Sequence, residues 1–247
     1  LLAQHPGDIA RLHDLGVTEV RRAESLEVLG RGAEAMRAMD VALERLAGAA
    51  RADPSNVRWR GEILHAQAGL LLMRIDAGLP AVSELALLGQ AAERAAKAGA
   101  SPDLLRETTA RLSTAQALLA AGEQDWPRAL LLGAEAARRV QEVVAYRREN
   151  WQGRELRARL GLLDMRAYAA LGDPARRLEA CTRLRDEFRP AIDAGQGGRA
   201  LEAWLIARAC SEGRTVDAAG LDRLTAGGYR PTDASLSSML SPQRGIP

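Results

Sequence analysis

The 247-residue sequence predicts an all-α fold, an α-solenoid in which antiparallel helix hairpins stack on one another. The first observation is a repeat, because prolines at positions 6, 54 and 102 mark turns and the steps 54 − 6 and 102 − 54 are both 48. The second is that Gly30 and Gly78 keep the same step of 48. The third is the composition, which is rich in alanine and only 3% aromatic and so favours closely packed helices over strands.

Each repeat is expected to hold two helices joined by a short turn, which makes neighbouring helices antiparallel. One hairpin alone leaves its apolar faces uncovered, so successive hairpins have to stack. In the first repeat the buried stripe of the second helix is Ala35, Met39, Ala42, Leu43 and Leu46. The repeats are predicted at about residues 5–52, 53–100, 101–148, 149–196 and 197–230, and a tail follows at 231–247.

Turn residues set the predicted helix bounds. Asp53 is expected to cap a helix that starts at Pro54, and Gly78 can take the left-handed conformation that ends it. Ser101 is the expected cap of the next first helix and Gly122 its terminator. The predicted helices cover about residues 8–29, 33–52, 53–77, 80–99, 101–122, 125–148, 150–171, 199–211 and 216–226, and one further helix runs from a break at 172–174 to about residue 194. Residues 229–247 are expected to be a short cap or a frayed tail.

The composition predicts one elongated domain over residues 1–247, since stacked repeats need no globular boundary. Leu1, Leu2 and Ala3 stand in register with the end of a second helix, so we expect a fragment of a longer protein. No window is apolar enough to span a bilayer, and the sequence does not open with a signal peptide. We expect a cytoplasmic location, and an extracytoplasmic domain of a membrane-anchored protein is the alternative.

Residues that carry chemistry are sparse. His5, His13 and His65 lack the spacing that places two metal ligands on one helix face, and we expect ordinary surface or half-buried histidines. Cys181 and Cys210 lie in apolar helical runs without metal-ligand spacing, and we expect buried free thiols. The sequence contains no nucleophile elbow, phosphate loop or dinucleotide fingerprint. We therefore expect a non-catalytic protein without metal or cofactor, and an all-helical enzyme is the least favoured hypothesis.

Positive charge gathers in the third and fourth repeats. Residues 128–189 hold 14 arginines against 9 acidic residues, although the net charge of the chain is only +2. One interpretation is an exterior laced with salt bridges, and the other is a groove that attracts an acidic peptide or an anion. Nucleic acid is not expected, because aromatic residues do not alternate with these arginines.

Large side chains give further expectations. Trp59 and Trp151 stand near the starts of first helices and are expected to pack against the preceding repeat. Trp126 precedes a proline at a turn and is the aromatic residue expected to be exposed for a partner. Leu43 and Leu160 are expected to lie in the core.

The repeats resemble the tetratricopeptide family in the spacing of small residue, glycine, alanine, large apolar residue and alanine-leucine. In the first repeat these positions are Ala23, Gly30, Ala35, Met39, Ala42 and Leu43. The family repeat is about 34 residues long, and the excess here follows a signature made by Asp53, Pro54, Asn56 and Trp59. This longer form, and an ending with Leu224, Gly228, Tyr229 and Arg230, is similar to arrays in bacterial multidomain signalling proteins.

The resemblance implies a right-handed solenoid that binds a protein or peptide segment along the inward face of its first helices. Counting back from the turn glycines gives Glu24, Gln116 and Arg166, and Arg74 is assigned in the second repeat by inspection. Arg159 and Arg208 are expected neighbours on this surface. An acidic segment is one expected partner. The alternative is a domain that senses a small ligand and controls an attached kinase, protease or DNA-binding domain. The oligomeric state stays open.

Overall fold

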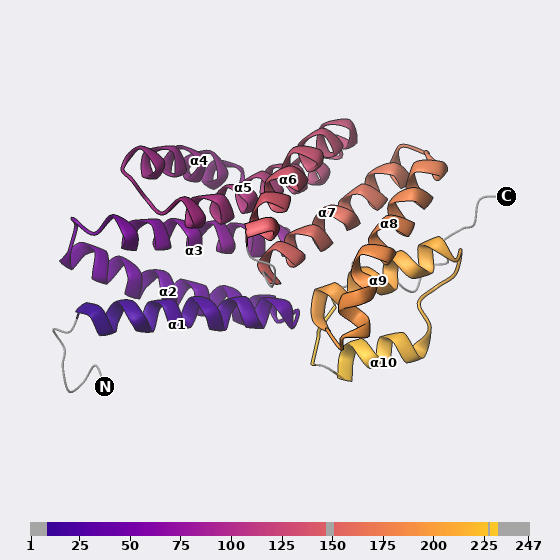
Figure 1. Ribbon diagram of the computed structural model, residues 1–247, viewed down its shortest axis with the longest axis horizontal. Helices are drawn as coiled ribbons and strands as arrows, with labels where there is room; N and C mark the ends of the chain where they lie inside the picture. The colour runs from indigo at the N-terminus through magenta and orange to yellow at the C-terminus, as the bar shows by residue number, and fades with distance from the viewer. Residues whose placement is uncertain (1–8, 147–150, 227, 232–247) are drawn as a thin grey trace. The chain divides into compact units, whose positions relative to one another are not determined.

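The computed structural model describes residues 9–146, 151–226 and 228–231, and this part of the chain forms ten helices and no strand (Figure 1). The all-α prediction is confirmed. Consecutive helices pack on one another, which is compatible with a helical repeat. The chain divides into two compact units, which we call the N-terminal unit (Leu1–Glu27 and Gly32–Gln116) and the C-terminal unit (Val28–Arg31 and Ala117–Pro247).

The N-terminal unit is built from the first five helices, and α5 continues past its boundary. Helix α2 packs on α3, and α3 packs on α4. The bounds are α1 Ile9–Val28, α2 Gly32–Ala52, α3 Val57–Asp76, α4 Val82–Lys97 and α5 Pro102–Gly122.

The core of the N-terminal unit follows the predicted stripe of α2. Met39 and Leu46 have no exposed surface, and they pack with residues of α1 and α3 such as Ala23 and Met73. Leu43, expected in the core, is only partly buried at its edge, because it lies beside the stripe of Met39, Ala42 and Leu46. The predicted face is confirmed for Ala35, Met39, Ala42 and Leu46, which are all fully buried.

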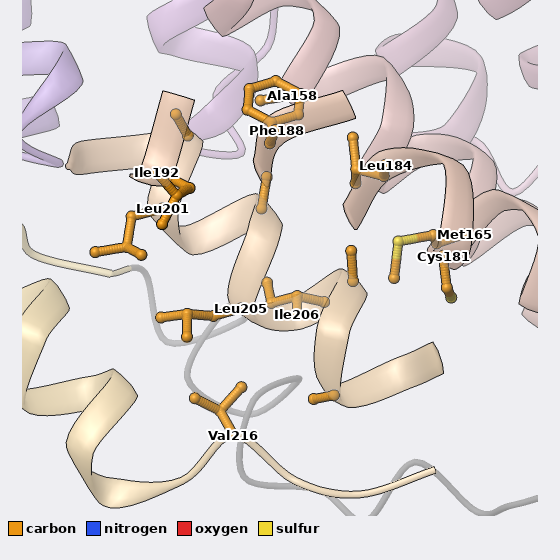
Figure 2. Packing of buried hydrophobic residues seen from close by; sticks show 14 of the residues in the cluster. Ala158, Met165, Cys181, Leu184, Phe188, Ile192, Leu201, Leu205, Ile206 and Val216 are labelled. Atoms are coloured by element: carbon orange, nitrogen blue, oxygen red, sulfur yellow. The ribbon is translucent and has the colours of Figure 1, made fainter. Parts of the chain in front are cut away.

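The C-terminal unit contains the remaining helices, in which α7 packs on α6, α8 and α9, α8 packs on α9, and α9 packs on α10. Its core gathers side chains of α7, α8 and α9, including Leu184, Phe188, Leu201 and Leu205 (Figure 2). Leu160 is 5% exposed, as predicted. The bounds are α6 Trp126–Tyr146, α7 Trp151–Ala170, α8 Pro174–Asp193, α9 Gly198–Ser211 and α10 Ala218–Ala226.

The two cysteines correct an expectation. Cys181 of α8 and Cys210 of α9 form a disulfide, with their Cα atoms 6.0 Å apart, so neither is a free thiol. Adjacent antiparallel helices bring together residues that are 29 apart in the sequence. This pairing depends on how α8 packs on α9, which the spacing of the cysteines does not encode.

Turn chemistry fixes most helix ends close to the predicted positions. Gly78 has φ of 70° and Gly172 has φ of 67°, the left-handed conformation that ends a helix and that glycine adopts without a steric penalty. Asp173 caps α8, because its carboxylate accepts a hydrogen bond from the backbone N–H of Arg176 at 3.0 Å. Pro174, predicted as part of the break, is the first residue of α8, where its missing N–H costs no helical hydrogen bond.

Two predicted caps lie elsewhere. Asn56, not Asp53, caps α3 by accepting from the backbone N–H of Trp59, while Asp53 accepts from the backbone N–H and the hydroxyl of Ser55. A tight turn therefore precedes the helix that was expected to start at Pro54. After α5 the left-handed residue is Gln124, with φ of 61°, instead of Gly122. Helix α5 continues through Gly122, so the residue two positions past its end is Gln124, just as Gly78 and Gly172 lie two positions past the ends of α3 and α7.

The described part of the tail acts as a cap. Tyr229 is 4% exposed and its hydroxyl donates to Oε2 of Glu202 on α9 at 2.6 Å. Burial and the neighbouring Glu202 raise the pKa of the Tyr229 phenol. Within the ranges that the structure describes, no helix is long and apolar enough to cross a membrane.

Candidate functional site

Glu24, the first predicted site residue, is buried in the N-terminal unit. Its Oε1 accepts a hydrogen bond from Nη2 of Arg111 on α5 at 2.5 Å, and the two side chains are only 4% and 7% exposed. The Nη1 of Arg111 also lies 3.5 Å from the backbone oxygen of His65 on α3. We call Glu24, His65, Thr108 and Arg111 the buried polar cluster. It joins α1, α3 and α5, so the predicted site residue Glu24 is bonded within the chain itself.

A glycine makes the cluster possible. A Cβ atom built on Gly69 of α3 would lie 2.5 Å from Nη1 of Arg111. Any side chain here would therefore displace the guanidinium, because real Cβ atoms do not approach other heavy atoms so closely. Gly69 is the gap through which Arg111 passes α3 to reach Glu24 on α1.

His65 completes the cluster as a neutral side chain. Its Nδ1 lies 3.4 Å from the hydroxyl of Thr108, and its Nε2 lies 3.8 Å from Glu24 and 3.9 Å from Glu107. Burial, and then the positive charge of Arg111, hold the pKa of His65 well below its usual range. Within residues 9–146, 151–226 and 228–231, no group of His, Cys, Asp or Glu side chains is arranged to hold a metal ion.

His13 links the first two hairpins. Its ring stacks on that of Trp59 with centroids 5.0 Å apart, and it bonds to Glu62 of α3 and to Asp14. Trp59 thus packs against the preceding repeat, as predicted. Both described histidines are buried, at 6% and 8% exposed, so the expectation of surface or half-buried histidines is wrong for them. His5 lies outside the described residues. The spacing of histidines along the sequence can indicate a metal site on one helix. It does not indicate whether a histidine is buried between two hairpins.

The other two predicted residues of the N-terminal unit differ in exposure. Arg74 is half-buried and donates to Glu84 of α4 and to the backbone oxygen of Pro80, so it closes the turn between α3 and α4. Gln116 is exposed on α5. Glu24 and Arg74 each bond to a residue that was not among the six predicted partner-binding residues, namely Arg111 and Glu84.

In the C-terminal unit, Arg159 and Arg166 lie on the same face of α7, two helical turns apart. Arg159 is 4% exposed and belongs to the interior, whereas Arg166 is exposed. Among the described residues Arg166 has no hydrogen bond and no ion pair. Many other arginines of this unit are paired, for example Arg157 with Glu187 and Arg183 with Asp164. The salt-bridged exterior is therefore the correct interpretation for these pairs, and Arg166 departs from it.

Arg208 lies beside a shallow hollow at the end of α9. Its guanidinium stacks over the ring of Trp204 at 5.3 Å from the centroid, and its Nε donates to Glu212. The hollow is lined by both apolar and polar residues: Leu205, Arg208, Ala209, Arg214, Thr215, Val216 and Asp217.

The remaining tryptophans differ from expectation. Trp126 is half-buried, so it is less exposed than predicted. Trp151 is 37% exposed, so its predicted packing against the preceding repeat leaves more than a third of it uncovered. Trp151 is the first residue of α7, at the edge of the helix packing.

Comparison with protein-family models, with curated proteins and with solved structures gives no match. The class of protein is therefore defined by the chain itself. It is an all-α array of consecutively packed helices with a buried polar cluster in one unit and an exposed arginine on a first helix of the other.

Proposed function

We propose that this chain is a non-catalytic scaffold domain that binds a protein or peptide segment through its first helices, in a bacterial signalling or regulatory protein. The proposal includes a right-handed solenoid of tetratricopeptide-like hairpins, supported by the 48-residue period and by the packing of consecutive helices. Binding by surfaces of this kind needs no catalytic group.

The observation that carries the proposal is the exposed guanidinium of Arg166. A charged side chain that is paired within its own domain has little to offer a partner, whereas Arg166 is unpaired among the described residues. Arginine binds a carboxylate through two parallel hydrogen bonds, which gives direction as well as attraction. We therefore infer a partner segment that presents aspartate or glutamate to α7.

The test uses synthetic peptides that match in length and differ in charge: acidic, neutral and basic. Fluorescence anisotropy is expected to give affinity for the acidic peptides that falls as salt is raised. Arg166→Ala is expected to weaken this binding several-fold. The matched control is Arg138→Ala, which removes an exposed arginine from the second helix α6. Equal losses in the two variants, or equal binding of acidic and basic peptides, would contradict the assignment of the site to first helices.

Ligand sensing is the second candidate function, and the hollow beside Arg208 favours it. Small-molecule sites combine apolar walls with a few polar groups, and this hollow is lined by Leu205 and Val216 together with Arg208 and Arg214. A thermal-shift screen of small carboxylic acids is expected to find a stabilising ligand whose effect Arg214→Ala removes. A screen in which Arg166→Ala removes the effect instead would assign the ligand to α7 and contradict this second candidate.

A further inference from the structure

The disulfide joins the two helices that form most of the C-terminal core. Cys181 lies in the middle of α8 and Cys210 at the end of α9, one residue before the helix terminates. These are the only two cysteines of the sequence, so the pair has no competing partner within the chain. The bond therefore closes one defined loop, from α8 through the Gly195–Gly198 joint to the last turn of α9.

The two sulfur positions differ in burial. Cys181 has no exposed surface and belongs to the core cluster with Met165 and Leu184, as Figure 2 shows. Cys210 is half-buried at the edge of the same cluster. A thiol from solution therefore meets Cys210 before Cys181.

We propose that the Cys181–Cys210 disulfide is a redox-cleavable staple that fixes the last turn of α9 against α8. It opens by thiol–disulfide exchange with a dithiol such as a reduced thioredoxin-type protein, or with two molecules of a low-molecular-weight thiol. The attacking thiolate forms a mixed disulfide with Sγ of Cys210, and Cys181 leaves as a thiolate that takes up a proton. The second thiol then attacks the mixed disulfide and releases Cys210, so that two external thiols become one disulfide and the protein gains two electrons and two protons.

Opening the staple leaves a folded helix pair that is held less firmly. Leu184 of α8 and Ile206 of α9 belong to the same buried apolar cluster, and we expect this packing to hold the two helices together when the disulfide is open. At the end of α9 a weaker contact lies next to it, the hydrogen bond of 3.3 Å from Arg185 to the hydroxyl of Ser211. The residues that line the hollow, Arg208 and Ala209, directly precede Cys210. Reduction therefore acts first on the last turn of α9 and on this hollow.

The staple also bears on the compartment. Disulfides persist in oxidising compartments, whereas in most cytosols cysteines are kept as reduced thiols. An intact Cys181–Cys210 disulfide therefore favours an extracytoplasmic location over the cytoplasmic location expected from the sequence. In a reducing cytosol we expect the two cysteines to be free thiols. This inference does not rest on partner binding, because its readouts are thiol content, stability and helix dynamics.

The first experiment counts thiols in the whole chain under denaturing conditions. Protein equilibrated with oxidised glutathione is expected to contain no alkylatable thiol, and protein treated with dithiothreitol is expected to contain two. Non-reducing electrophoresis is expected to show a monomer for the native sequence, whereas Cys181→Ala leaves Cys210 without its partner and gives a glutathione adduct or a dimer. Two reactive thiols in the oxidised sample, or disulfide-linked dimers of the native sequence, would overturn the proposal.

The second experiment measures what the staple does. Reduction is expected to lower the melting temperature by about 5 °C or more, since closing a loop of this length stabilises a protein appreciably. The double variant Cys181→Ala/Cys210→Ala is the matched control and is expected to melt at the same temperature with and without dithiothreitol. Hydrogen exchange is expected to quicken in the last turn of α9 and to stay unchanged in α2. An unchanged melting temperature on reduction, or exchange that quickens equally in both helices, would contradict a staple at this position.

Discussion

The guanidinium of Arg111 on α5 hydrogen-bonds to the carboxylate of Glu24 on α1, and 87 residues separate them in the sequence. To reach α1, the side chain of Arg111 extends past the backbone of α3, the first helix of the intervening hairpin, at Gly69. Both side chains are almost fully buried, so each charge is compensated mainly by the opposite charge of its partner and not by water. Several measurable consequences for the N-terminal unit rest on this pair.

Removing one partner of the pair is expected to be far more destabilising than removing both. Arg111→Met leaves the Glu24 carboxylate buried without its charge partner and is expected to lower the free energy of unfolding by about 3–5 kcal/mol. The double variant Glu24→Leu/Arg111→Met is expected to recover most of that loss, because no uncompensated charge remains. Urea unfolding measures both. Arg22→Ala, at an exposed pair with Glu19, is the control and is expected to change little. A double variant as unstable as Arg111→Met alone would contradict this account.

Gly69→Ala tests the passage of Arg111 past α3. The added methyl group would occupy the space of Nη1, and we expect a loss of about 1–3 kcal/mol in the free energy of unfolding. Gly89→Ala is the matched control, because a Cβ there meets nothing within 4 Å and glycine is a poor helix former. That variant is expected to be slightly stabilising. Similar effects of the two substitutions in urea unfolding would show that Gly69 is not a required gap.

Replacing core leucines by alanine is expected to destabilise the protein more where the leucine is more deeply buried. Leu46→Ala and Leu160→Ala, at positions 0% and 5% exposed, are each expected to lower the free energy of unfolding by about 2–5 kcal/mol. Leu43→Ala is expected to cost less, since Leu43 lies at the edge of the core. Chemical denaturation of the three variants gives the comparison. A larger loss for Leu43 than for Leu46 would mean that α2 packs through a different face.

His65 is expected to make stability depend on pH on the acid side of neutrality. Its pKa in the folded chain lies well below the unfolded value of about 6.5, so the unfolded chain takes up a proton that the folded chain does not. Stability is therefore highest above about pH 6.5 and falls as the pH drops from there toward the folded-state pKa. His65→Asn is expected to flatten the curve in this window. Three charged groups surround the His65 ring: Glu24 and Glu107 near Nε2, and Arg111 of α5. All three are the same in the native protein and in His65→Asn. A His65→Asn curve with the slope of the native protein would assign the titration to another group.

The sequence predicts the helices well because their ends are local events. Gly78 and Gly172 act through backbone preferences that a few neighbouring residues decide, and the structure has a helix end at each. The choice between Asp53 and Asn56 as a cap is harder. Both side chains can accept backbone hydrogen bonds, and only the actual path of the turn selects one.

The candidate site is less predictable, because it depends on how distant segments approach. A first-helix position next to a small residue reads the same at Glu24 as at Arg166, yet one is buried and the other exposed. Arg111 was not predicted, because between Thr109, Ala110, Leu112 and Ser113 it looks like an ordinary surface arginine of an amphipathic helix. Only its burial in the structure shows that it requires a buried partner. The identity of that partner follows only from the packing of α1, α3 and α5.

The phenol of Tyr229 sets a limit on where this chain can be shortened. A protein ending after α10 would keep every described helix, but it would lose the donor to the Glu202 carboxylate, which is 2% exposed on α9. Successive truncations from the C-terminus are therefore expected to lower stability once Tyr229 is removed. A recombinant fragment that is cut at the last helical residue would lack part of its own interior.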